Sequence, residues 1–199
     1  MNFNGVGGST ILYGARRKAG GGGRASPQGS RHHLDMPASR PAIDYIERTR
    51  AQYDALGYPP YRWVEKPETP SFAPLNKPVR ESRVALIGSG GIYARGQVAF
   101  HFKDDTSFRV IDTTAPTSEL RATHFAYDVT DARRDVNVVF PIDTLNALVD
   151  SGDVGSLSEN AYAFMGGVYS SRRVEDRMAP AIADRIEADE VDLALLVPV

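Results

Sequence analysis

The sequence has no cysteine, so disulfide bonds, thiolate metal sites and cysteine nucleophiles are absent from its 199 residues. Long apolar runs are also missing. The longest, 191–199, is interrupted by Asp192 and Pro198, and it falls well short of the ~20 apolar residues that a membrane span requires. The net charge of −2 does not favour binding to nucleic acid. What remains is an ordinary globular composition, 42% hydrophobic and 24% charged, at a length that suits one domain.

Residues 1–40 differ from the rest of the chain. They carry six basic side chains against one acidic side chain, and nine of the eighteen glycines. Such a segment buries too little apolar surface to offset the entropy of ordering its backbone. We therefore expect a disordered Gly/Arg-rich tail, with the natural start of the protein near Met36 and the preceding residues an artefact of the gene model. A basic, acid-poor organellar transit peptide is the alternative. The adjacent His32 and His33 lack further ligands and do not indicate a metal site.

Residues 41–82 are expected to form a helix followed by a proline-rich arm. Pro41 suits a first helical turn, apolar residues recur at helical spacing, and Gly57 provides a stop. Residues 58–78 then contain six prolines, which disfavour any regular element. Four aromatic residues lie among these prolines: Tyr58, Tyr61, Trp63 and Phe72. Their density predicts an arm that packs over a surface.

Residues 83–199 alternate between strand-like and helix-like segments. Short apolar runs predict strands over 83–88, 107–111, 136–140 and 191–197. Apolar residues at helical spacing predict helices over 142–149 and 171–188. The second helix has apolar residues four apart at Val174, Met178, Ile182 and Ile186. Strands that are apolar on both faces and alternate with helices indicate an α/β fold. We expect an open, mostly parallel sheet with helices on both faces, of the doubly wound or flavodoxin-like kind.

A glycine-rich loop, Gly88-Ser89-Gly90-Gly91, follows the first predicted strand. A dinucleotide-binding fingerprint would need a further glycine at position 93, where the sequence has Tyr93, and no Gly-Lys-Ser/Thr of a phosphate-binding loop follows. A nicotinamide enzyme is therefore disfavoured. The glycines either permit a sharp turn or line a ligand crevice, because open α/β sheets bind ligands outside the carboxyl ends of their strands.

Polar side chains are dense between residues 104 and 137. His124 and Asp128 could form an acid–base pair in which the carboxylate fixes the imidazole tautomer, or a plain hydrogen bond. Arg109 could bind a substrate carboxylate, or it could pair with Asp128 and stabilise the fold. Metal binding is disfavoured, because His124, Asp128 and Asp135 are the only ligands at hand.

Several segments, in order along the chain, match a known family. They are DTSFRVI at 105–111, HFAYD at 124–128, DVNVVFP at 135–141, GSL at 155–157, YAFMG at 162–166 and VDLALLVP at 191–198. Together they resemble the selenoprotein B family, from about Ile43 to the last residue. That family comprises the selenocysteine-bearing subunits of glycine, sarcosine and betaine reductases and of D-proline reductase.

The resemblance implies reductive cleavage of a C–N bond in an amino acid or its N-methylated relative, with a dithiol as reductant, in a cytoplasmic, oligomeric enzyme. In amino-acid-specific members a partner subunit supplies a pyruvoyl carbonyl that activates the substrate amine, and a selenolate attacks the α-carbon. Members continue past the strand at 191–197 with selenocysteine or cysteine. We therefore expect that residue just after Val199. The α/β domain, 83–199, is then incomplete and inactive as written, as when a UGA codon is translated as a stop.

On this interpretation the substrate site lies at the glycine loop. Gly90, Gly91 and Arg109 would bind the carboxylate of an amino-acid-type substrate, and His124, oriented by Asp128, would protonate the departing amine. No metal, nucleic acid or membrane is expected to take part. The expected partners are pyruvoyl-bearing or other reductase subunits and a thiol reductant. The alternative is a non-catalytic binding or assembly subunit of the same fold, which holds a partner through its aromatic arm.

Overall fold

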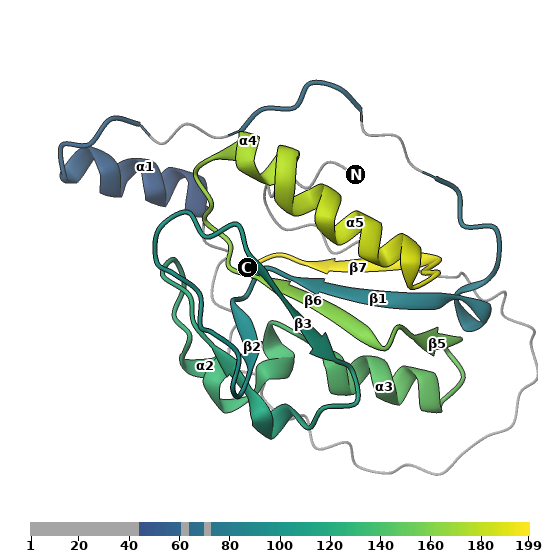
Figure 1. Cartoon of the computed structure of the whole chain (residues 1–199). Coiled ribbons are helices and arrows are strands. Elements are labelled where there is room, and N and C mark those ends of the chain that lie inside the picture. The colour runs from purple at the N-terminus through teal and green to yellow at the C-terminus, as the bar shows by residue number, and fades with distance from the viewer. Residues whose placement is uncertain (1–43, 61–63, 70–72) are drawn as a thin grey trace, which may run out of the picture. The chain divides into compact units, whose positions relative to one another are not determined.

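The computed structural model describes residues 44–60, 64–69 and 73–199 (Figure 1). A compact unit that extends from Lys66 to Val199 holds the sheet and its helices, whereas helix α1 belongs to the preceding unit. Several expectations concern residues outside the described ones, namely the disordered tail, the start near Met36 and the aromatic residues Tyr61, Trp63 and Phe72 of the arm.

Helix α1 spans Tyr45–Ala55, within the helix expected after Pro41. Asp44 caps it, because the carboxylate accepts hydrogen bonds from the N–H groups of Ile46 and Glu47, each at 3.1 Å. Gly57 follows the helix with a φ of +69°, the left-handed conformation typical of a helix stop. The described part of 58–78 contains no helix or strand, as its prolines require.

The sheet is built around strand β1. The strands of the described residues are β1 (Arg83–Gly88), β2 (Ile92–Ala94), β3 (Phe108–Asp112), β4 (Leu120–Ala122), β5 (Ser156–Leu157), β6 (Asn160–Phe164) and β7 (Leu193–Val197). β1 pairs in parallel with β7 along most of its length, with β5 at its start and with β6 at its end. β3 is antiparallel to β6. β2 and β4 form a separate antiparallel pair. The predicted open, mostly parallel sheet is confirmed.

Helices cover both faces of this sheet, as predicted. They are α2 (Thr130–Arg134), α3 (Ile142–Asp150), α4 (Ser171–Arg173) and α5 (Ala179–Ala188). Figure 1 shows α3 on one side of the sheet and α5 on the other. Leu86 of β1 packs in the cluster that contains Ile142 and Leu145 of α3. The next residue, Ile87, packs with Ile182 of α5, because successive side chains of a strand point to opposite faces.

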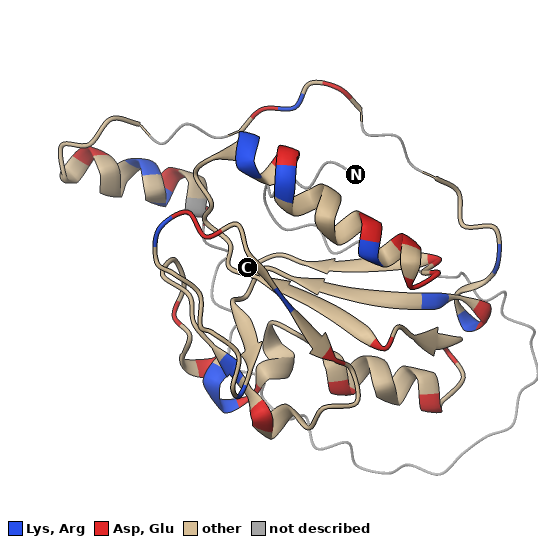
Figure 2. Cartoon of the chain, in the orientation of Figure 1, with Lys and Arg blue, Asp and Glu red and all other residues tan. Residues whose placement is uncertain are grey.

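The predicted helix over 171–188 is a continuous helical segment with an irregular middle. Val174–Met178 forms a π-helical turn between α4 and α5. The four apolar side chains spaced four apart are all buried against the sheet: Val174, Met178, Ile182 and Ile186. Figure 2 shows that the charged residues gather on helices and loops and leave β1, β6 and β7 almost uncharged. The prediction for this helix is confirmed.

The predicted strand over 136–140 is wrong. Val136–Val138 forms a 3-10 turn instead, capped by the Asp135 carboxylate, which accepts from the Asn137 N–H at 2.9 Å. Val138 points outward, 57% exposed, whereas Phe140 is fully buried. A capping aspartate offered the backbone a local hydrogen bond that competes with a sheet ladder, and this outweighed the β-branched composition.

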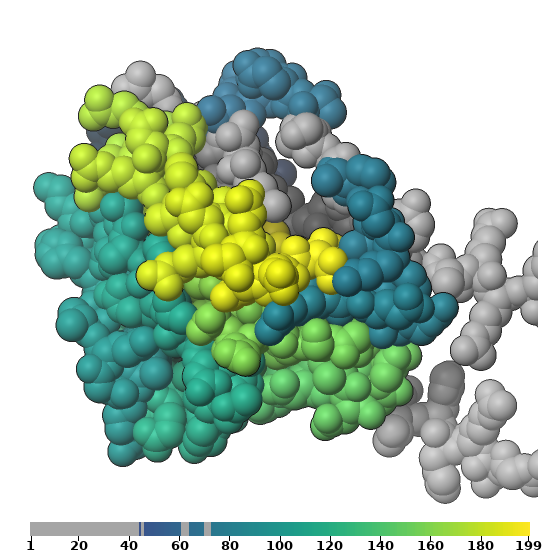
Figure 3. Space-filling view, turned by 45° about the vertical axis from the view of Figure 1, so that its right-hand side comes forward, coloured from purple at the N-terminus to yellow at the C-terminus, as the bar shows by residue number. Residues whose placement is uncertain are grey.

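Strand β7 lies at an edge of the sheet. It pairs with β1, and no other strand of the described residues pairs with it. Its side chains are therefore only partly buried, and Leu196 is 47% exposed. Figure 3 shows residues near the C-terminus, in yellow, at the surface. Among the described residues, the apolar run at 191–197 is thus paired on one side, with β1. No helix in the part of the chain that the structure describes has the length and hydropathy to cross a membrane.

A polar network joins the end of α5 to β6. The Tyr162 hydroxyl donates to Asp189 Oδ2 at 2.6 Å, and the same carboxylate accepts from Asn160 Nδ2 and Ser158 Oγ, each at 3.2 Å. The hydrogen bond from Tyr162 is the main cause that holds the pKa of Asp189 below its ordinary value. Tyr162 is 1% exposed, so this network ties a core residue to the connection that leads into β7.

Candidate functional site

The carboxyl ends of β1, β6 and β7 meet at Ser89. The Ser89 N–H donates to the Val197 carbonyl at 3.1 Å, and its carbonyl accepts from the Gly166 N–H at 2.9 Å. Its hydroxyl accepts from the Val199 N–H at 2.9 Å. The glycine loop and the last residues of the chain are thus joined at the edge where open α/β sheets bind ligands.

The two predicted substrate-binding glycines have different surroundings. Gly91 has a φ of +70°, and a Cβ there would lie 1.9 Å from the Thr123 carbonyl oxygen, so only glycine fits. Its N–H donates to the Phe164 carbonyl at 3.0 Å and is engaged within the fold. A Cβ on Gly90 would lie 3.4 Å from Val199. Gly90 therefore lies next to Val199, and binding of substrate by either glycine stays a prediction.

His124 lies next to this loop. Its Nδ1 accepts a hydrogen bond from the Ala126 N–H at 3.0 Å, and its ring contacts the Tyr127 ring with centroids 4.6 Å apart. Tyr127 in turn donates through its hydroxyl to the Gly90 carbonyl at 2.9 Å. The Nε2 atom is buried and has no hydrogen-bond partner among the described residues. Burial lowers the pKa of His124, which favours the uncharged ring.

Asp128 does not orient His124. Its carboxylate accepts from the Thr130 N–H at 2.9 Å and from the Thr130 hydroxyl at 2.6 Å, at the start of α2. These hydrogen bonds lower the pKa of Asp128. The predicted His124–Asp128 pair is not formed, because Nδ1 of His124 and the Asp128 carboxylate each accept from a backbone N–H two residues further along.

Arg109 of β3 holds the segment before its own strand. Its guanidinium donates to the carbonyls of Val98, Ala99 and Phe108 and to the Ser107 hydroxyl. It also stacks over the ring of Phe100 at 4.3 Å. The alternative pairing of Arg109 with Asp128 is thus not formed. Within the described ranges, four of the five guanidinium N–H groups donate to these partners. A contact between Arg109 and substrate stays a prediction.

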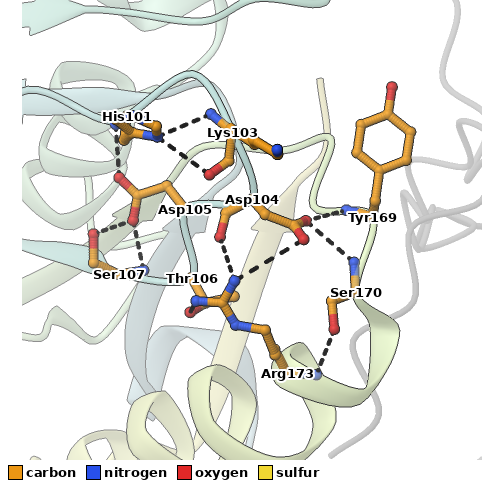
Figure 4. A network of polar contacts seen from close by, with 9 residues as sticks. All are labelled: His101, Lys103, Asp104, Asp105, Thr106, Ser107, Tyr169, Ser170 and Arg173. Carbon is orange, nitrogen blue, oxygen red and sulfur yellow. Dashed lines mark hydrogen bonds and ion pairs between the residues drawn. The ribbon is translucent and has the colours of Figure 1, made fainter.

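A network that sequence reasoning missed fixes the loop at 99–107 (Figure 4). Asp104 adopts a φ of +51°, and its Oδ1 accepts from the N–H groups of Tyr169 and Ser170 at 2.7 and 3.2 Å. Arg173 donates to the Asp104 carbonyl and to the Thr106 hydroxyl. The two segments lie at the same edge as the glycine loop, since Phe108 of β3 pairs with Phe164 of β6. Asp104 belongs to the dense polar stretch, and Arg173 belongs to α4. No spacing in the sequence links these two segments.

No group of three or more histidine, aspartate or glutamate side chains in the described ranges could hold a metal ion. The polar side chains that lie together at this edge are instead the His124 imidazole and the Ser89 hydroxyl. Such groups bind ligands through hydrogen bonds.

Comparisons with known proteins match most of the chain, including the segments between residues 105 and 198 given above. Residues 64–198 match the family model described as glycine/sarcosine/betaine reductase selenoprotein B. The D-proline reductase subunit gamma of Acetoanaerobium sticklandii is 31% identical over 127 residues, which are 64% of this chain and 52% of that protein. The glycine reductase complex component B subunit gamma of Symbiobacterium thermophilum is 31% identical over 140 residues, covering 64% and 32%. The chain thus spans about half or less of these relatives. No solved structure matches it.

Proposed function

The chain belongs to the glycine/sarcosine/betaine reductase selenoprotein B family, and from this premise we propose that it serves as a subunit of a selenol- or thiol-dependent reductase complex. The proposed reaction cleaves a C–N bond of an amino acid or an N-methylated amino acid in the cytoplasm. The observation that carries the proposal is the family match over residues 64–198. It is supported by relatives named as subunits of D-proline reductase and of a glycine reductase complex.

The proposed chemistry needs a chalcogen nucleophile and a dithiol. A selenolate or thiolate attacks the α-carbon, and the nitrogen leaves with the electron pair of the C–N bond and takes up a proton. The dithiol then supplies two electrons that break the new carbon–chalcogen bond: the carbon takes up a proton and leaves as the deaminated acid, the chalcogenolate is regenerated, and the dithiol becomes a disulfide. We propose that a pyruvoyl carbonyl on a partner subunit activates the substrate amine.

The nucleophile of this proposal lies outside the printed sequence, which has no cysteine. We propose that a selenocysteine or cysteine follows Val199. Two contacts support this position: the Val199 N–H donates to Ser89, and Gly90 lies next to the Val199 side chain. A chalcogenolate here would occupy the carboxyl edge of the sheet, where ligands of open α/β proteins bind.

The test is purification of the protein from its own host, together with the subunits that accompany it. Intact-mass measurement shows whether the product continues beyond Val199. Dithiothreitol oxidation is then followed with glycine, sarcosine, betaine and D-proline, one at a time. The proposal expects oxidation that depends on one of these substrates and is lost when this subunit is left out. A complex that assembles and oxidises dithiothreitol equally with and without this subunit would overturn the proposal.

A further inference from the structure

The imidazole of His124 is held in one tautomer. The Ala126 N–H donates to Nδ1 at 3.0 Å, and a nitrogen that accepts a hydrogen bond cannot carry the proton in the neutral ring. The proton therefore sits on Nε2. Tyr127 fixes the orientation of the ring, since it packs against the imidazole and is anchored to the Gly90 carbonyl.

The Nε2–H that results has no acceptor among the described residues, although the atom is buried. Buried polar groups in folded proteins nearly always have a partner. The other buried side-chain atom without one in the described ranges, Arg83 Nε, lies at the start of β1 and away from the carboxyl edge. An unpartnered donor at the ligand-binding edge of an α/β sheet indicates an acceptor that arrives with a ligand.

Space beside this nitrogen depends on Gly166. A Cβ at position 166 would lie 3.2 Å from His124 Nε2 and 3.5 Å from the Ser89 carbonyl oxygen. Any other residue there would crowd the donor. Ser89 is also the residue whose hydroxyl holds the Val199 N–H. Gly166 thus lies near both the donor and the Ser89 carbonyl, and Ser89 in turn contacts the end of the chain.

We infer that His124 is an uncharged hydrogen-bond donor whose Nε2–H binds a carboxylate oxygen of the amino-acid-type substrate. The inference rests on the proposed function and replaces the expectation that His124 protonates the departing amine. A hydrogen bond from a neutral N–H to a carboxylate is charge-assisted and needs no proton transfer. Neutral imidazole is known to serve as such a donor when its environment disfavours the charged ring.

The first test needs no reductase activity, so its failure is distinct from failure of the proposed function. The chain is labelled with 15N-histidine, and the resonances of His124 are assigned by their loss in His124→Gln. We expect the neutral ring with its proton on Nε2 at pH 7.5. Acetate and glycine should shift the Nε2–H resonance, whereas acetamide and chloride should not. A proton on Nδ1, a charged ring at pH 7.5, or an equal response to acetate and chloride overturns the inference.

The second test compares two amides in the assembled complex. Glutamine places its NH2 near the position of Nε2, and asparagine places it near that of Nδ1. We expect His124→Gln to retain KM within a few-fold and His124→Asn to raise KM about tenfold or more, with kcat changed less. Gly166→Ala should also raise KM, because its Cβ fills the space beside Nε2.

His101→Gln is the matched control, since His101 lies on an exposed loop and its own Nδ1 accepts from the Lys103 N–H. It should leave KM unchanged. Melting curves of each variant separate loss of fold from loss of binding. A fall in kcat of about a hundredfold in both His124 variants, with KM unchanged, would assign His124 to proton transfer and refute the inference.

Discussion

Replacing Tyr162 by phenylalanine tests whether the tyrosine of the YAFMG segment serves the fold. Phenylalanine keeps the ring, which is 1% exposed and packs against α5, and removes the hydroxyl that donates to Asp189 at 2.6 Å. Hydrogen bonds to charged groups contribute about 1.5–3 kcal/mol. Asp189 keeps its bonds from Ser158 and Asn160. We therefore expect the free energy of unfolding to fall by about 1.5 kcal/mol, the lower end of that range.

Urea unfolding at pH 7 should show the loss as a lower midpoint with an unchanged slope, and the melting temperature should fall by about 3–6 °C. The loss should also depend on pH. Tyr162 holds the pKa of Asp189 below its ordinary value, so the stability from this bond is present above the unfolded pKa of about 3.9. That stability is lost as pH falls through the lower pKa of the folded state. The free energies of unfolding of the parent and of Tyr162→Phe should therefore become equal in acid.

Tyr127→Phe is the matched control. Its hydroxyl donates to the neutral Gly90 carbonyl, so we expect a loss of about 1 kcal/mol that stays constant as carboxylates are protonated. The reasoning is refuted if Tyr162→Phe is as stable as the parent at pH 7. It is also refuted if the difference between them persists unchanged below the pKa of Asp189.

Three further predictions concern two glycines, the N-terminal tail and the edge strand. Gly91→Ala should prevent soluble expression, because its Cβ would lie 1.9 Å from a backbone oxygen, whereas Gly96→Ala, also left-handed but in open space, should cost about 1–2 kcal/mol in urea unfolding. A chain that starts at Met36 should melt as cooperatively as the full chain, and loss of solubility would contradict the expected dispensable tail. Leu196→Lys on the edge strand should reduce concentration-dependent association in gel filtration, and a parent chain that is already a compact monomer at all concentrations would contradict this.

The elements with a strong apolar period could be predicted from the sequence. β1 and the helical segment at 171–188 have hydrophobic patterns that burial alone explains. The structure of the segment at 136–140 could not be predicted in this way. Its composition is that of a strand, but the Asp135 carboxylate accepts a hydrogen bond from the nearby Asn137 N–H and caps a 3-10 turn. Side-chain capping of this kind outweighs β propensity, which is itself a measure of packing.

The location of the candidate site residues could be predicted from the sequence, but their hydrogen-bond partners could not. The glycine loop and His124 do lie together at the carboxyl edge, as a loop after a buried strand suggests. The spacing of four between His124 and Asp128 suggested a pair. Residues four apart face each other regularly on a helix, but α2 begins only at Thr130. The partners of Arg109 are mostly backbone carbonyls of another segment, which no residue type in the sequence identifies.

The π-helical turn at Val174–Met178 sets the phase between the two halves of its helix. In an α-helix, residues four apart drift by about 40° per step, so a stripe with that period winds off the face that it should cover. A wider turn absorbs part of this drift, and the stripe from Val174 to Ile186 stays against the sheet. If one residue were deleted within the turn while α5 kept its packing against the sheet, Arg173 would rotate about the helix axis by about 100°. The hydrogen bonds from Arg173 to the loop at 99–107 would then break. A change of length in the buried helix would therefore alter the loop beside the candidate site.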